Sequence, residues 1–169
     1  VVITGHDLTV DQIIAVCREG AEVVLSDESR EKILASRQVV NELVEERKVV
    51  YGITTGFGKF SDVVISQDEC KLLQKNLIIT HAVGAGDPFK EDIARGILLL
   101  RVNSLSNGFS GICLETVETM IAMLNKGVTP FIPEKGSLGA SGDLAPLSHM
   151  VLPMIGLGMA WYKGELLPG

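Results

Sequence analysis

The stretch Gly136-Ser-Leu-Gly-Ala-Ser-Gly-Asp-Leu-Ala-Pro-Leu-Ser-His149 places three small residues, Ala140, Ser141 and Gly142, directly before an expected helix. Small side chains let the nitrogen of Gly142 approach the carbonyl carbon of Ala140, and glycine tolerates the backbone angles that this approach needs. Attack of that nitrogen on that carbon, with loss of two waters that include the Ser141 hydroxyl, gives a methylidene-imidazolone (MIO) ring. We expect this ring to be a strong electrophile that needs no external cofactor.

Three simpler interpretations of the same stretch are a plain tight turn, an anion site at a helix N-terminus and a nucleophilic serine. The stretch matches neither of the glycine-rich phosphate motifs, G-x-x-x-x-G-K-[ST] and G-x-G-x-x-G. Its local order is Gly-Ala-Ser-Gly rather than the G-x-S-x-G of the hydrolase elbow. The wider context from Gly136 to His149 favours cyclisation over all three.

Composition limits the class of protein. A chain of 169 residues predicts one domain, and its 46% hydrophobic content is enough to form a core. The net charge of −6 argues against a nucleic-acid partner. The longest apolar stretch, residues 97–100, is flanked by Arg95 and Arg101 and is too short to span a bilayer. We therefore expect neither a nucleic acid nor a membrane as partner.

The three cysteines, Cys17, Cys70 and Cys113, are far apart and form no C-x-x-C pair. This spacing predicts no metal site and no disulfide framework. We expect each cysteine to be a small, reduced core residue in a cytoplasmic protein. The N-terminus also lacks a basic region followed by an apolar run, so the sequence predicts no secretory signal.

Hydrophobic periodicity predicts a mainly α domain over residues 1–169, with strands at 1–3 and 23–25 forming a small β-ribbon. The expected helices cover, approximately, residues 8–18, 27–48, 67–80, 87–108, 111–127 and 143–158. Their expected boundaries follow from cap and breaker residues: Ser26, the Ser66/Glu69 capping box, Pro88 at a first helical position, Ser110, Gly127 and a kink at Pro153.

The glycine-rich breaks between these helices carry a family resemblance. Tyr51-Gly-Ile-Thr-Thr-Gly-Phe-Gly58, Asn76-Leu-Ile-Ile-Thr-His81-Ala-Val-Gly-Ala-Gly86 and the Ala140-Ser141-Gly142 stretch follow one another in this order. Together they resemble the motifs of the histidine and aromatic amino-acid ammonia-lyases. Arg101-Val-Asn-Ser-Leu105 and Gly108-Phe-Ser-Gly111 are similar to the helix junction of that family. The resemblance covers nearly the whole chain.

This resemblance implies a helical N-terminal domain from the aspartase-like all-α fold, bearing the MIO ring, without the C-terminal helical bundle of the family. It implies deamination of L-histidine to urocanate. A tyrosine or phenylalanine ammonia-lyase, an aminomutase using the same ring, and a non-catalytic scaffold that forms no ring remain open. Phe109 stands where many bacterial histidine enzymes of the family carry histidine or another polar residue.

The resemblance also implies roles for individual residues. Tyr51 is expected to be the base that removes the β-proton, and His81 to contact the substrate side chain. Asp143 is expected to support ring formation from Ala140, Ser141 and Gly142. The alternatives are a buried tyrosine, a histidine that caps its own helix and an ordinary N-cap aspartate.

Partners follow from the same resemblance. The family members are homotetramers whose active sites combine residues from several subunits. We therefore expect an amino-acid substrate, a tetrameric full-length form, and little turnover from residues 1–169 alone. Apolar faces left uncovered in such a fragment favour self-association.

Of the remaining histidines, His149 is expected to be structural and His6 to lie on a surface turn.

Overall fold

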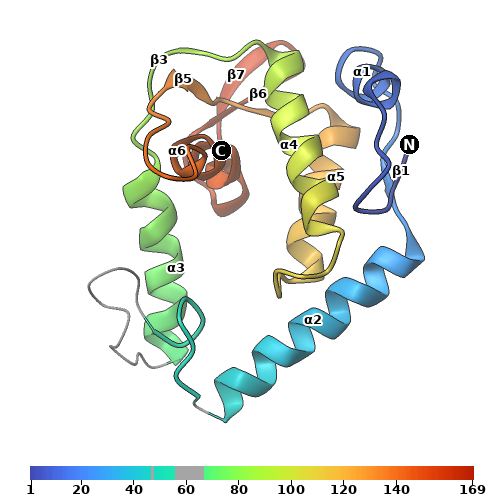
Figure 1. The fold of residues 1–169 in the computed structure, drawn as a ribbon. Helices are drawn as coiled ribbons and strands as arrows, with labels where there is room; N and C mark the ends of the chain where they lie inside the picture. The colour runs from blue at the N-terminus through green and yellow to red at the C-terminus, as the bar shows by residue number, and fades with distance from the viewer. Residues whose placement is uncertain (47, 56–66) are drawn as a thin grey trace.

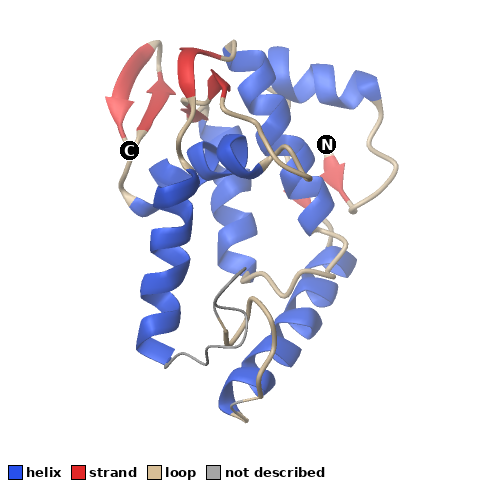
Figure 2. Ribbon diagram, turned by 60° about the vertical axis from the view of Figure 1, so that its left-hand side comes forward, coloured by secondary structure: helices blue, strands red, loops and turns tan. Residues whose placement is uncertain are grey.

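The structure is a computed structural model that describes residues 1–46, 48–55 and 67–169, without the side chains of residues 67–71. The helices in this part of the chain are α1 (Val10–Arg18), α2 (Asp27–Glu45), α3 (Gln67–His81), α4 (Glu91–Leu105), α5 (Leu114–Lys126) and α6 (Leu144–Val151). The strands are β1 (Val2–Ile3), β2 (Val24–Leu25), β3 (Ala85–Pro88), β4 (Thr129–Pro130), β5 (Pro133–Lys135), β6 (Met159–Tyr162) and β7 (Glu165–Pro168). This mainly α architecture confirms the predicted fold class (Figures 1 and 2).

The core forms where α4 packs against α5, with α1 on the other side of α4. Both central helices bury residues spaced three or four apart, which places them on one helical face. These buried residues are Ala94, Leu98, Leu99, Val102 and Leu105 on α4, and Val117, Met120, Ile121, Met123 and Leu124 on α5. Removal of this apolar surface from water is the main force that holds the helices together.

A two-stranded parallel ribbon closes one side of the core and confirms the prediction for the N-terminal strands. Val2 pairs with Val24 and Ile3 with Leu25. Asn125 of α5 holds the ribbon in place, because its side chain accepts a hydrogen bond from the nitrogen of Val23 and donates one to its oxygen, both at 2.8 Å.

Two expected helix starts are wrong. Asp87 and Pro88 belong to β3, and α4 begins at Glu91 after the N-cap Lys90. The fixed φ of proline suits an extended strand as well as a first helical turn, and pairing of β3 with β5 decides between them. Similarly, Ser110 does not cap α5, which begins at Leu114.

The last expected helix is shorter than predicted. α6 ends at Val151 and continues only as a 3-10 turn, η2 (Leu152–Ile155), which carries Pro153 near its start. Gly156 then ends the turn with a φ of +74°. The chain continues into the antiparallel hairpin of β6 and β7, which pairs with β4. Residues 129–138 contain two short strands, β4 and β5.

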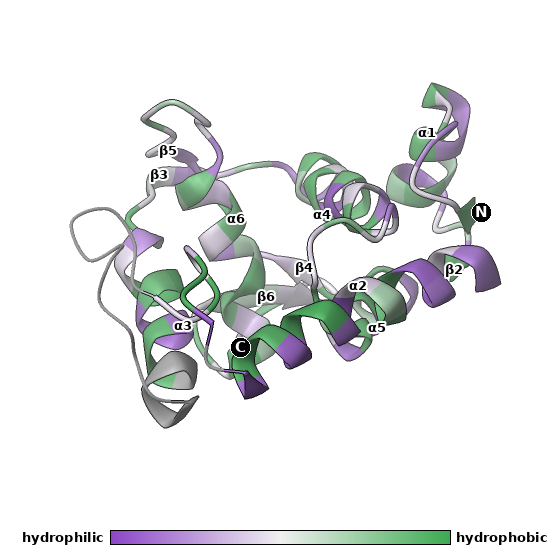
Figure 3. Cartoon of the chain, turned by 60° about the horizontal axis from the view of Figure 1, so that its bottom comes forward, coloured by the Kyte–Doolittle hydropathy of each residue, from purple (hydrophilic) through white to green (hydrophobic). Residues whose placement is uncertain are grey.

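The Ser26 cap of α2 is confirmed, because its hydroxyl accepts a hydrogen bond from the nitrogen of Ser29 at 3.1 Å. The helix then extends away from α4 and α5 (Figure 1), and of its apolar residues only Ile33 is buried. Figure 3 shows polar residues at its N-terminal end and apolar residues along its middle.

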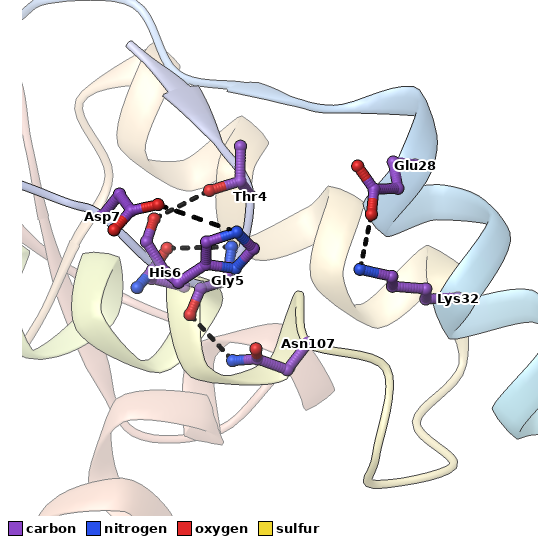
Figure 4. A network of polar contacts seen from close by, with 8 residues as sticks. Thr4, Gly5, His6, Asp7, Glu28, Lys32 and Asn107 are labelled. Carbon is purple, nitrogen blue, oxygen red and sulfur yellow. Dashed lines mark hydrogen bonds and ion pairs between the residues drawn. The ribbon is translucent and has the colours of Figure 1, made fainter.

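The junction after α4 joins three parts of the fold. Asn103 accepts a hydrogen bond from the nitrogen of Gly5 at 3.2 Å, and the Asn107 amide donates to the Gly5 oxygen at 2.8 Å (Figure 4). Next to it, a Cβ on Gly108 would lie 2.5 Å from the Cβ of Lys32 and 2.7 Å from the Lys32 carbonyl carbon. The backbone of this junction therefore contacts α2 closely.

We expect Gly108→Ala to destabilise the fold more than Gly127→Ala. The two glycines have nearly the same left-handed conformation, with φ of +73° and +70°, but nothing lies within 4 Å of a Cβ on Gly127. The control should lose ~1 kcal/mol from backbone strain alone, and Gly108→Ala a further ~1–3 kcal/mol from the overlap with α2. Thermal unfolding midpoints measure the difference, and equal midpoints would contradict this close contact.

Candidate active site

Two of the glycine-rich loops lie side by side at the C-terminal end of α3. β3 and β5 form an antiparallel pair, with Ala85 opposite Lys135 and Pro88 opposite Pro133. Residues 81–84 lead into β3 and residues 136–142 lead out of β5, so this pairing places the two loops next to each other (Figure 1).

The contact between the loops is backbone against backbone. A Cβ on Gly136, where φ is +131°, would lie 2.9 Å from the Cα of Gly84. A Cβ on Gly84 would lie 2.9 Å from Nε2 of His149 and 3.0 Å from the Cβ of Pro133. Real Cβ atoms do not approach other atoms so closely, so both positions require glycine.

His149 links α6 to the first of these loops. Its Nε2 accepts a hydrogen bond from the nitrogen of Gly84 at 2.9 Å. Burial lowers the pKa of the half-buried imidazole, because a low-dielectric surrounding disfavours the charged form. The ring is therefore held neutral, with its proton on Nδ1. The structural role expected for His149 thus includes a direct contact with the candidate site.

His81 is the last residue of α3, and its Nδ1 lies 2.7 Å from the carbonyl oxygen of Leu77. A ring nitrogen can approach a carbonyl oxygen in this way only as a donor, so Nδ1 carries a proton and Nε2 is the ring nitrogen left to face a ligand. His81 caps its own helix, as the alternative interpretation expected, and still offers one nitrogen to a ligand.

Ala140, Ser141 and Gly142 form a bend that ends just before α6. Ala140 and Ser141 are exposed, and Gly142 has a φ of +71°. A Cβ on Gly142 would lie 3.4 Å from the hydroxyl of Ser137. No bulky side chain lies within 4 Å of a Cβ on Gly142, and the only left-handed position among the three residues is this glycine. The segment therefore fits the requirements of the ring that the sequence predicts.

Asp143 occupies the N-cap position of α6, and its carbonyl accepts the hydrogen bond of the Leu147 nitrogen at 3.0 Å. Its side chain is exposed and makes no capping hydrogen bond. The side-chain hydrogen bond by which an N-cap aspartate usually caps its helix is therefore not made by Asp143.

Tyr51 lies elsewhere in the chain. Its side chain is 62% exposed on a turn that the Thr54 hydroxyl closes by accepting from the Val50 nitrogen at 2.9 Å. Residues 48–55 (teal) run beside the N-terminal half of α3, whereas residues 136–142 (orange) lie at its C-terminal end (Figure 1). Ile53 helps to line a groove of about 620 Å³ between α2 and residues 107–111, where Phe109 is 91% exposed.

Several predictions lie outside the described residues: the second half of the tyrosine loop with Lys59, and the Ser66/Glu69 capping box.

Cys17 and Cys113 are half-buried free thiols, and burial raises the pKa of Cys17. Nowhere in the described ranges do three His, Cys, Asp or Glu residues gather as a metal ion would need. Every described helix is too short or too polar to serve as a membrane span.

Sequence reasoning missed the contacts that join the two loops. Gly84 and His149 are 65 residues apart, and neither residue type signals its partner. The run of small residues from Ala82 to Gly86 was the one available hint, because a loop without side chains permits a close approach.

Comparison with known proteins supports the resemblance. Residues 8–169 match the family described as aromatic amino acid lyase. The whole chain is 60% identical to histidine ammonia-lyase of Caldanaerobacter subterraneus subsp. tengcongensis, of which it covers 33%. The chain thus spans about a third of the length of the curated relatives it matches.

Solved structures share the fold. Ergothionase of Treponema denticola, in complex with desmethyl-ergothioneine sulfonic acid, superposes with a TM-score of 0.94 at 31% identity, over 99% of this chain and 34% of that one. Histidine ammonia-lyase of Trypanosoma cruzi superposes with a TM-score of 0.90 at 40% identity, over 99% of this chain and 32% of that one.

We expect the stability of the fold to fall as the pH falls from about 7.5 to about 5.5, partly through His149. Its pKa lies below the ordinary value of 6.5 in the folded chain, so the unfolded chain binds more protons in the interval between the two. His149→Gln removes this titration and keeps an acceptor. The thermal midpoint of the wild type should decline more steeply with acidification than that of the variant, and parallel declines would contradict the assignment.

Proposed function

Because the chain belongs to the aromatic amino acid lyase family, we propose that the protein deaminates L-histidine to urocanate and ammonia. Residues 1–169 supply its ring-bearing N-terminal domain. One observation carries the proposal: the Ala140-Ser141-Gly142 bend lies in the loop that packs against the loop following His81. The curated relatives at 57–61% identity are histidine ammonia-lyases, which supports histidine as the substrate.

The electrophile would form from the chain itself. The nitrogen of Gly142 attacks the carbonyl carbon of Ala140, and two waters leave, one of them with the Ser141 hydroxyl oxygen. The left-handed conformation of Gly142 and the absence of bulky side chains around the bend support this reaction. Once formed, the MIO ring supplies an electron-accepting carbon, which no ordinary side chain provides.

The start of α6 supports the same chemistry. Gly142 lies two residues before Leu144, the first residue of the helix. The positive end of the helix dipole favours electron density on the oxygen atoms of residues 140–142. Asp143, whose carboxylate makes no capping hydrogen bond, remains available to orient the backbone during ring formation.

Tyr51 would accept the β-proton of the substrate. A phenol has an ordinary pKa of ~10, so it needs positive charge nearby to act as a base at neutral pH. Residues 48–55 lie away from the bend at residues 140–142 in this chain (Figure 1). The role therefore fits an assembly in which Tyr51 of one copy serves a site in another, as the homotetramers of the family imply.

His81 would recognise the substrate side chain. Its Nδ1 proton is donated to Leu77, so the free Nε2 is an acceptor for the N–H of an imidazole. A phenylalanine side chain offers no such donor, and the unpaired nitrogen would disfavour it. With Tyr51 supplied by another copy and about two thirds of the relatives' length missing here, residues 1–169 alone should have little turnover.

Ser141→Ala tests the proposal, because alanine has no hydroxyl to lose. In a form with the length of the relatives, the wild type should be lighter than its sequence mass by two waters, and the variant should not. Ammonia release from histidine should fall about a thousandfold. Ser137→Ala, in the same loop, should keep the mass loss and the activity. A wild type of full sequence mass would instead support a non-catalytic scaffold.

His81→Leu should shift substrate preference towards phenylalanine. Loss of the acceptor at Nε2 removes a hydrogen bond made only by histidine, so the ratio of kcat/KM for histidine to that for phenylalanine should fall at least about tenfold. Ile79→Val, a conservative change at an exposed position of α3, should keep the ratio. An unchanged ratio in His81→Leu would remove His81 from this role.

A further inference from the structure

Three segments meet at Gly84. Nε2 of His149 on α6 accepts the hydrogen of the Gly84 nitrogen, a Cβ on Gly84 would lie 3.0 Å from the Cβ of Pro133 on β5, and Gly136 packs on the Gly84 Cα. Gly84 is therefore the point at which α6, with the bend before it, contacts the loop that carries His81.

The hydrogen bond is specific in chemistry. Only a neutral imidazole protonated on Nδ1 can accept at Nε2, since an imidazolium has no lone pair to offer. An apolar side chain of similar size would fill the same space but would leave the Gly84 nitrogen without its partner. A purely packing role would not require a nitrogen at this position.

The link from Gly84 to His81 is short and rigid. The nitrogen of Val83 donates to the carbonyl of His81 at 2.9 Å, and the nitrogen of Ala82 donates to the carbonyl of Ile78 at 3.1 Å. These bonds tie the segment before Gly84 to the end of α3, where His81 lies. On the other side, His149 lies within the same short helix whose start follows Gly142.

We propose that His149 is a positioning residue, which holds His81 at a fixed place relative to residues 140–142 through its hydrogen bond to the Gly84 nitrogen. This inference rests on the proposed function, since the fixed distance serves to align the substrate side chain with the ring. His149 itself touches no substrate in this assignment and acts only through Gly84 and His81.

The test uses the protein at the length of its relatives, with His149→Met and His149→Leu as variants without a nitrogen or oxygen acceptor. His149→Gln is the matched control, because its amide oxygen lies near the position of Nε2 and can accept. Hydrogen–deuterium exchange is read by mass spectrometry on a peptide that contains the Gly84 amide, with an α4 peptide as a measure of folding. KM and kcat for histidine are measured on the same samples.

In the apolar variants we expect about tenfold faster exchange at Gly84, about tenfold higher KM and a change in kcat of less than about threefold. The reason is that alignment of the side chain strengthens binding of the ground state and of the transition state equally, so its loss raises KM more than it lowers kcat. His149→Gln should restore most of both. Unchanged exchange at Gly84 in a folded apolar variant, an unchanged KM, or a His149→Gln variant no better than His149→Met would overturn the proposal.

Intact mass distinguishes a failure of the proposed function from a failure of the His149 proposal. A wild type without the loss of two waters contradicts the proposed function. The His149 proposal is contradicted by variants that keep this mass loss and the protection of α4 but show none of the expected changes at Gly84 and in KM.

Discussion

The close approach of two glycine backbones, Gly84 and Gly136, is the constraint on which the candidate site depends. β3 and β5 are short, and their pairing is irregular between Ala85 and Pro88. They can hold two functional loops together only because neither loop has a side chain where they cross. The helical core is different, since many buried side chains of α4 and α5 each contribute to the packing between the two helices. The arrangement of the two loops therefore depends on fewer contacts than the packing of the helical core does.

Much of the fold was predictable where a local signal acts alone. Ser26 caps α2 and Gly127 ends α5 as expected, because hydrogen bonding and left-handed geometry at helix ends are decided by neighbouring residues. Pro88 misled the prediction, since its fixed φ suits two structures and a strand distant in sequence selects one. Where pairing with a distant strand decides where a helix or strand begins, the residues at that boundary give no local signal of it.

The site divides in the same way. The roles of Ala140, Ser141 and Gly142 were predicted from the stretch between Gly136 and His149, and that of His81 from the family resemblance of its motif, and these roles stay predictions. The contacts of Gly84 with Gly136 and His149 could not be predicted, because a glycine in the sequence indicates which backbone conformations are allowed and does not indicate its neighbours in the fold. Histidine at position 149 suggested a structural residue, and only the geometry showed that its nitrogen reaches the loop of His81.

Tyr51 lies apart from the other candidate site residues. His81 and Ser141 lie on loops joined by β3, β5 and α6, whereas the turn of Tyr51 belongs with Ile53 to the groove along α2. A proton transfer needs its donor and acceptor within hydrogen-bond reach. One chain with this arrangement holds residues 140–142 beside the loop that follows His81 and keeps Tyr51 apart from both. The proton transfer proposed for Tyr51 would therefore run between copies of the chain.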